Sequence, residues 1–142
     1  MAESDASVVL AHGAWADGSS WGKVIAGLRS KSVKVVAAPL PLTSLTEDVA
    51  ALDRTLERVQ GPVVVVGHAY AGAVIGSTGD GKVASLVYVT ALAPDEGETV
   101  ADVFYRAEPP GGRSRRLASA CRCRIRFGKT DRAGSLWPWR TA

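Results

Sequence analysis

The 142-residue sequence contains two cysteines, two histidines and no long apolar run. A membrane-spanning helix needs about 20 consecutive apolar residues, so we expect no membrane span. The N-terminus has no basic segment followed by an apolar one, and we expect a cytoplasmic protein. Cys121 and Cys123 stand too close together for an ordinary structural disulfide. We interpret them as separate thiols and expect neither a metal site nor another cofactor, because both histidines lie far upstream.

The charge is divided unevenly along the chain. Residues 1–105 carry 7 Lys/Arg and 12 Asp/Glu, a net charge of −5, whereas residues 106–142 carry 10 Lys/Arg and 2 Asp/Glu, a net charge of +8. Hydrophobic periodicity also ends near Tyr105, and arginine then alternates with small residues, as in Arg113-Ser114-Arg115-Arg116. This composition predicts a core over residues 1–104 and a disordered basic tail over residues 105–142.

The tail has two interpretations. A GC-rich gene read out of frame yields sequence rich in Arg, Pro, Gly and Trp, so we favour a frameshift near residues 105–112. The alternative is a genuine basic tail that binds nucleic acid or an anionic surface, with an affinity that falls steeply with salt. We rank nucleic-acid binding last among the functions considered.

Up to about residue 103, short β-branched runs alternate with helical patterns, which predicts a parallel sheet with crossover helices. The expected strands cover residues 7–10, 33–37, 63–66 and 84–90. Apolar residues at helical spacing predict a first helix around Trp21 to Leu28. A second helix follows Ser44, which forms a capping box with Glu47. Its expected packed face is apolar, with Asp48 mostly on the other side.

A tight turn is predicted after the third strand, at Gly67-His68-Ala69-Tyr70-Ala71-Gly72. A β-branched strand precedes it and a small-residue helix follows, which is the context of the G-x-S-x-G nucleophile elbow. Ala69 occupies the position of the serine, so the expected hydroxyl is a methyl group. Ala71 occupies the position of the last glycine, where a Cβ could crowd the turn.

A second turn, His12-Gly13-Ala14-Trp15, ends the first strand. Acyl transfer needs two backbone N–H donors for the developing oxyanion, one from this early loop and one from the residue after the nucleophile. By position these donors are the amides of Ala14 and Tyr70. We expect His12 to support the loop through hydrogen bonds, and Trp15 to line a substrate pocket with His12, Gly13 and His68.

Together these segments resemble the α/β-hydrolase superfamily, in particular its small esterase and hydroxynitrile-lyase-like branch. The matching segments are residues 8–15, 40–42, 67–72 and 86–89, and the resemblance extends from residue 7 to about 103. It implies a partial α/β-hydrolase fold, a four-stranded sheet in the order 2-1-3-4 with flanking helices. It also implies a Ser–Asp/Glu–His triad that cleaves small esters without metal or cofactor.

The triad itself is incomplete in this sequence. Asp95 and Asp102 follow the fourth strand, where parts of the superfamily carry the acid, and a solvated loop carboxylate is the alternative for both. Neither His12 nor His68 is assigned as the general base. Ser19 and Ser20 suit a helix start, and Ser77 is expected to face along the elbow helix, so we assign none of them as a nucleophile.

Three functional hypotheses follow from these features. The first is an inactive, truncated hydrolase, and the second is a non-catalytic binder of small apolar ligands near Trp15, Ala69 and Tyr70. The third is binding through the basic tail. The fourth strand would be an open sheet edge rich in Val, Leu and Tyr, which can pair two copies into a dimer.

Overall fold

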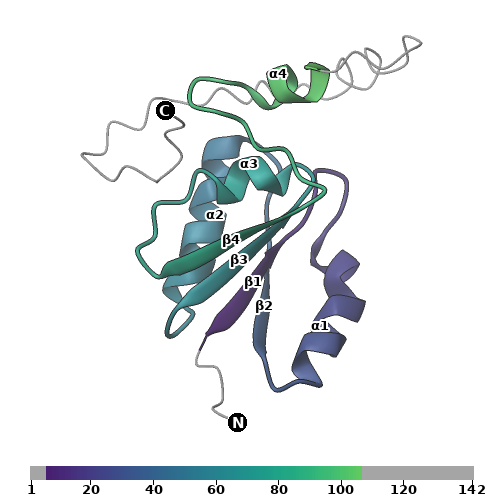
Figure 1. Cartoon of the computed structure of the whole chain (residues 1–142), viewed down its shortest axis with the longest axis vertical. Helices are drawn as coiled ribbons and strands as arrows, with labels where there is room; N and C mark the ends of the chain where they lie inside the picture. The colour runs from purple at the N-terminus through teal and green to yellow at the C-terminus, as the bar shows by residue number, and fades with distance from the viewer. Residues whose placement is uncertain (1–5, 107–142) are drawn as a thin grey trace.

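The computed structural model describes residues 6–106. They form a four-stranded parallel sheet in the order β2-β1-β3-β4 (Figure 1). The strands are β1 (Ser7–Ala11), β2 (Lys34–Ala38), β3 (Val63–His68) and β4 (Val83–Val89). The predicted fold class and strand order are confirmed. The expectations for the basic tail lie almost entirely outside the described residues.

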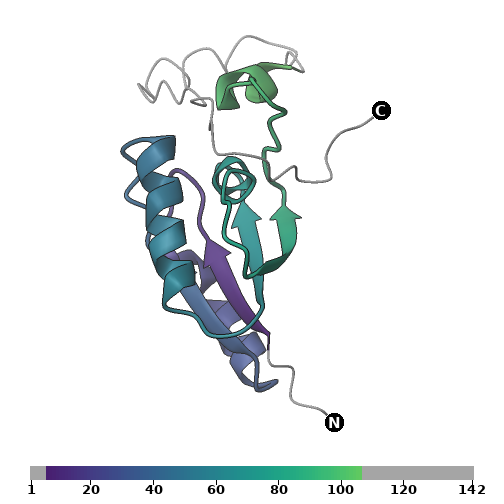
Figure 2. The same cartoon turned by 90° about the vertical axis from the view of Figure 1, so that its left-hand side faces the viewer.

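Helices cover the two faces of the sheet unequally. On one face, α2 (Leu45–Glu57) and α3 (Ala71–Ile75) pack over the sheet and enclose the larger core (Figure 2). On the other face, η1 (Gly18–Trp21) and α1 (Gly22–Arg29) pack over β1 and β2. The larger core contains fully buried Leu52, Leu56 and Ile75, whose burial contributes roughly 1.5–3 kcal/mol each. In the described part of the chain, no helix is long and apolar enough to cross a membrane.

The start of α2 differs from the expectation in two respects. The Ser44 hydroxyl accepts a hydrogen bond from the Glu47 amide at 3.2 Å, as predicted for an N-cap. The Glu47 carboxylate, however, accepts a hydrogen bond from the Thr43 hydroxyl. The expectation for Asp48 was wrong, since its side chain is fully buried. Two hydrogen-bond donors hold it there, and both belong to the candidate site described below.

A short helix, α4 (Val100–Tyr105), follows the sheet and was not expected. Thr99 is its N-cap: the Thr99 hydroxyl accepts from the Asp102 amide at 3.1 Å, and the Asp102 carboxylate accepts from the Thr99 amide at 2.8 Å. This reciprocal arrangement is a capping box. Its signal in the sequence is Thr99 followed three residues later by an acidic residue.

The turn after β3 packs closely against the chain that follows β4. A Cβ on Gly72 would lie 2.1 Å from the carbonyl oxygen of Leu92 and 2.8 Å from the Cβ of Ala91. The Leu92 amide also donates a hydrogen bond to the carbonyl oxygen of Ala69 at 3.0 Å. Only glycine fits at position 72 without displacing this backbone.

Gly72→Ala should therefore lower the free energy of unfolding by about 3 kcal/mol, because the added methyl group clashes with backbone rather than with a flexible side chain. Urea denaturation followed by circular dichroism measures the change. Gly79→Ala is the matched control, since a Cβ there meets nothing within 4 Å. Equal stability of the two variants would contradict the close approach at Gly72.

Candidate functional site

Ala69 lies in the tight turn that joins β3 to α3, with a left-handed φ of 52°. This conformation is unfavourable for a residue with a Cβ, by roughly 1–2 kcal/mol. Backbone hydrogen bonds hold it: the Ala69 carbonyl oxygen accepts from the amides of Gly72 at 3.1 Å and Leu92 at 3.0 Å. The strand, the strained turn and the helix thus have the geometry of a nucleophile elbow around a residue without a nucleophile.

Two glycines make this turn sterically possible. A Cβ on Gly67 would lie 2.9 Å from both the Ala71 carbonyl oxygen and Cδ1 of Ile75. Ala71 is the first residue of α3 and is fully buried. The second glycine that the turn requires is thus Gly72, one residue after the motif position that Ala71 occupies.

The loop after β1 lies directly against the elbow. A Cβ on Gly13 would lie 3.3 Å from the Cβ of Ala69 and 3.4 Å from Nδ1 of His68. Among the residues that the structure describes, the Ala14 amide donates to no acceptor. Tyr70 is the N-cap of α3 and directly follows Ala69. The residues named as the two oxyanion donors therefore belong to the two segments that meet at Ala69.

His12 is buried and uses both ring nitrogens in hydrogen bonds. The Leu40 amide donates to Nε2 at 3.2 Å, so this nitrogen is an acceptor and the proton resides on Nδ1. Nδ1 in turn donates to the Gly13 carbonyl oxygen at 3.0 Å. His12 therefore connects the early loop to the segment between β2 and α2, which leaves no ring nitrogen to accept a proton from a nucleophile.

Asp48 provides a second connection to the same segment, which sequence reasoning missed. Its Oδ1 accepts from the Leu42 amide at 2.7 Å, and its Oδ2 accepts from the Tyr70 hydroxyl at 2.6 Å. Leu42 has a left-handed φ of 59°, so the carboxylate also holds a strained backbone. The segment between β2 and α2 is thereby tied to the early loop through His12 and to the elbow through Asp48.

His68 is exposed, and its ring lies edge-to-face with Trp21, with ring centroids 6.3 Å apart. Trp21 is buried, and its indole Nε1 has no hydrogen-bond partner among the described residues. Trp15, the tryptophan expected in the pocket, is 77% exposed. The tryptophan that packs beside the elbow is thus Trp21, which the sequence pattern assigned only to a helix face.

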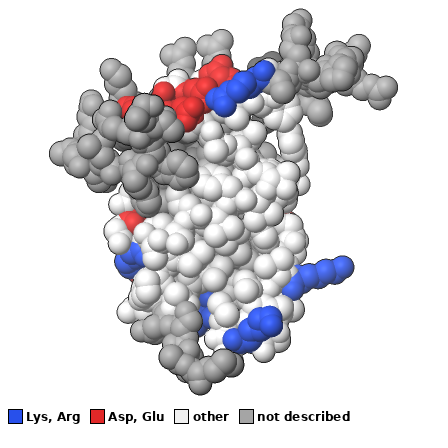
Figure 3. Space-filling model, viewed as in Figure 1, with Lys and Arg blue, Asp and Glu red and all other residues white. Residues whose placement is uncertain are grey.

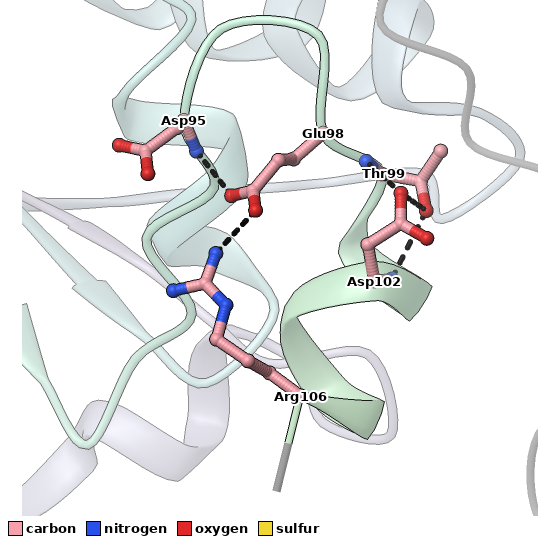
Figure 4. A network of polar contacts seen from close by, with 5 residues as sticks. All are labelled: Asp95, Glu98, Thr99, Asp102 and Arg106. Atoms are coloured by element: carbon pink, nitrogen blue, oxygen red, sulfur yellow. Dashed lines mark hydrogen bonds and ion pairs between the residues drawn. The ribbon is translucent and has the colours of Figure 1, made fainter.

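The two candidate acids lie in a polar network around α4 (Figure 4). Asp102 contacts Thr99, which lowers the carboxyl pKa of Asp102 through hydrogen bonds from the Thr99 hydroxyl and amide. The Asp95 amide donates to Glu98 at 2.8 Å, and Arg106 pairs with the same glutamate. These hydrogen bonds, with that from Asp95 the largest cause, lower the pKa of Glu98. Asp102 therefore serves as the partner of Thr99 in the capping box of α4.

The serines considered as nucleophiles all have local structural contacts. Ser19 and Ser20 lie in η1, whose N-cap is Asp17: the Ser19 amide donates to Oδ1 of Asp17 at 2.7 Å, and the Ser20 hydroxyl donates to the Asp17 carbonyl. The hydrogen bonds from Ser19 lower the pKa of Asp17. The Ser77 hydroxyl donates to the Ala73 carbonyl at 2.8 Å, along the elbow helix as expected. Within residues 6–106, no group of His, Cys, Asp and Glu is arranged to hold a metal ion.

A sequence model of the alpha/beta hydrolase family matches residues 8–141. The chain belongs to the α/β-hydrolase family. A carbendazim hydrolyzing esterase from Nocardioides sp. (strain SG-4G) is 30% identical over 120 residues, which cover 74% of this chain and 50% of that protein. The chain therefore spans about half the length of the curated relative it matches. The family match also extends beyond residue 103, where the resemblance noted from sequence motifs ended.

Solved structures of pyrethroid hydrolases share the fold. A PytH variant with serine replaced by alanine superposes with a TM-score of 0.61 at 25% identity, over 73% of this chain and 47% of that one. A pyrethroid hydrolase from Sphingobium faniae JZ-2 superposes with a TM-score of 0.58 at 25% identity, over 66% and 43% of the two chains. The common part is about half of each of those enzymes.

Asp48→Ala should lower the free energy of unfolding by about 2 kcal/mol, because it leaves the Leu42 amide and the Tyr70 hydroxyl without their buried acceptor. Asp48→Asn should cost less, since its carbonyl oxygen can still accept from Leu42. Chemical denaturation measures both values. Tyr70→Phe, which removes one of the two hydrogen bonds, is the matched control. Its loss of unfolding free energy should be smaller than that of Asp48→Ala. An Asp48→Ala variant as stable as the parent would contradict this role.

Acid should open the start of α4 before it unfolds the core. The folded pKa of Asp102 lies below its ordinary value of 3.8, so the cap stabilises α4 above that pH and is lost as the pH falls through the lower folded value. Hydrogen exchange or chemical shifts of the Thr99 and Asp102 amides, followed from pH 6 downward, measure this loss. Asp102→Asn should remove the pH dependence at these amides. An unchanged titration in that variant would show another group to be responsible.

Proposed function

We propose that this chain is an esterase-type member of the α/β-hydrolase family that lacks the chemistry of its family. The observation that carries the proposal is Ala69, a methyl-bearing residue held at a left-handed φ where the elbow presents its reactive side chain. A methyl group cannot attack a carbonyl carbon, so the first step of acyl transfer has no nucleophile.

The absence of a free histidine supports the same proposal. The whole sequence contains only His12 and His68. His12 uses Nε2 as an acceptor for the Leu40 amide and Nδ1 as a donor to Gly13. His68 directly precedes Ala69, and its ring packs against Trp21. A triad needs a base that accepts the proton of the nucleophile, and neither ring is arranged for that transfer.

The names of the relatives suggest a class of substrate, which we propose for the ancestral site. One relative is named as a carbendazim hydrolyzing esterase and others as pyrethroid hydrolases. We infer that the surface around Ala69 derives from a site for small ester-type molecules. The amides of Ala14 and Tyr70 would have bound the oxyanion in such a site, and His12, Gly13, Trp15 and His68 would have lined it.

Ester hydrolysis by the parent chain should not exceed the buffer rate, and Ala69→Ser should raise it less than about tenfold, because a serine without its base remains a weak nucleophile. Release of p-nitrophenol from p-nitrophenyl acetate, measured from pH 6 to 9, tests both statements. Ala69→Ser with His68→Ala is the control for a contribution from the neighbouring imidazole. Turnover by the parent chain, or recovery of several orders of magnitude by Ala69→Ser, would contradict the proposal.

Binding without catalysis is the second candidate function. The Ala14 amide, which donates to no acceptor within residues 6–106, and the exposed aromatic ring of Trp15 favour it, because both belong to the loop that meets the elbow at Ala69. Titration of carbendazim or a pyrethroid into the full chain, followed by Trp fluorescence, should then saturate. Trp15→Ala should weaken the saturation, and a linear response in the parent chain would remove this candidate.

A further inference from the structure

The residue directly after β4 has the same unusual backbone conformation as the elbow. Thr90 has a left-handed φ of 45°, and Ala69, directly after β3, has one of 52°. The register pairs His68 with Val89, so the two left-handed residues follow paired positions of neighbouring strands. A β-branched residue such as threonine is rarely found at a positive φ. Contacts of the surrounding chain must therefore hold Thr90 in this conformation.

The hydrogen bonds on the two sides of Thr90 both end on Ala69. The Val89 carbonyl oxygen accepts from the Ala69 amide at 3.4 Å, and the Leu92 amide donates to the Ala69 carbonyl oxygen at 3.0 Å. We call residues 89–92 the strap, because this segment binds both polar groups of the Ala69 backbone. A strained backbone persists where the surrounding structure fixes it. We therefore attribute the conformation of Thr90 to its attachment to the elbow.

The side chain of Thr90 does not hold the strap. Thr90 is exposed, and its hydroxyl has no hydrogen-bond partner within residues 6–106. Charged groups do not hold the strap either, because all four of its residues are uncharged. In Figure 3, acidic and basic side chains adjoin at the end of the molecule that carries α4, and the middle of this face carries none. The polar network of that end begins at Asp95, beyond the strap, where the Asp95 amide donates to Glu98 at 2.8 Å.

The strap also lies against the start of α3. A Cβ on Gly72 would lie only 2.1 Å from the Leu92 carbonyl oxygen, so the two backbones are in direct contact. Figure 1 shows the chain leaving β4 and passing the start of α3 on its way to α4. Movement of the strap would thus free the backbone of Ala69 and uncover the first turn of α3.

We propose that the strap is a two-state conformational switch with Thr90 as its strained hinge. In the closed state described above, Thr90 and Ala69 are both left-handed and two hydrogen bonds join the strap to the elbow. In the released state these bonds are broken, and both residues relax to the conformations that residues with a Cβ prefer.

The switch would control the candidate site, because the elbow keeps its conformation only while the strap is closed. Tyr70 directly follows Ala69, so the orientation of its amide changes when Ala69 relaxes. The strain at Thr90 favours release, and the two hydrogen bonds oppose it. The inference concerns the conformation of the elbow, and it is tested without any reaction, apart from the proposed loss of catalysis.

Amide hydrogen exchange of the full chain, followed by NMR, measures the released population. The informative amides are those of Ala69 and Leu92, the donors of the two bonds. Thr90→Gly should slow the exchange of both at least threefold, because glycine adopts the left-handed conformation without the cost of a Cβ. Ala69→Gly should slow the Leu92 amide by a similar factor, because it relieves the strain at the other end of the same bonds. Thr90→Asn should act in the same direction as Thr90→Gly, since asparagine tolerates this conformation.

Two matched controls separate the switch from a general gain in stability. Ser32→Gly relieves a left-handed φ of 60° in the turn after α1, outside the strap, and should leave both exchange rates unchanged. Thr90→Val keeps the β-branched shape and removes only the hydroxyl, so its exchange rates should equal those of the parent chain. Circular dichroism on each variant shows that the fold is retained.

Four results would overturn the proposal. Thr90→Gly and Thr90→Asn could both leave the two amides unchanged, so that strain at this position would have no part in opening. Ser32→Gly could slow them as much as Thr90→Gly, which would show that they exchange only when the whole fold opens. Thr90→Val could match Thr90→Gly, which would assign the effect to the hydroxyl. Ala69→Gly could leave the Leu92 amide unchanged, which would show that the elbow and the strap relax separately.

Discussion

The left-handed backbone at Ala69 is the constraint on which the candidate site depends. Its carbonyl oxygen accepts from two amides, one in the following helix and one in the chain after β4, so the turn is fixed from both sides. Gly67 and Gly72 allow this because their missing side chains admit backbone from α3 and from Leu92. The elbow is therefore built by backbone contacts, and it forms without any contribution from a catalytic hydroxyl.

The segment between β2 and α2 connects the early loop and the elbow, the two halves of the site. It supplies the Leu40 amide to His12 beneath the early loop and the Leu42 amide to Asp48, which also accepts from Tyr70 at the elbow. These buried polar groups have their hydrogen-bond partners, and such networks make an arrangement unique because each broken contact is costly. The relative placement of the early loop and the elbow thus rests on two side chains that are not themselves reactive.

Much of this arrangement could be predicted from the sequence. Val63 to Val66 are four consecutive β-branched apolar residues, a run that predicts a buried strand. Ser44 is predicted as a helix N-cap from the residues directly around it. Asp48 could not be placed, because a carboxylate in an amphipathic helix is ordinarily solvated and its partners lie 6 and 22 residues away. The short helix after Thr99 was missed because six residues show almost no periodicity. Trp21 was assigned to a helix, but its contact with His68 on β3 joins distant parts of the chain, which no local pattern relates.

Alanine at position 69 differs in its consequences from both glycine and serine. Glycine would adopt the same left-handed backbone without strain, so alanine is not the residue that stability alone would favour there. Alanine does, however, differ from serine by a single oxygen atom and keeps the Cβ that an elbow presents. If position 69 is the nucleophile position, as we propose, the change from serine is chemically minimal, because one oxygen atom is absent and the strained backbone that would hold it persists.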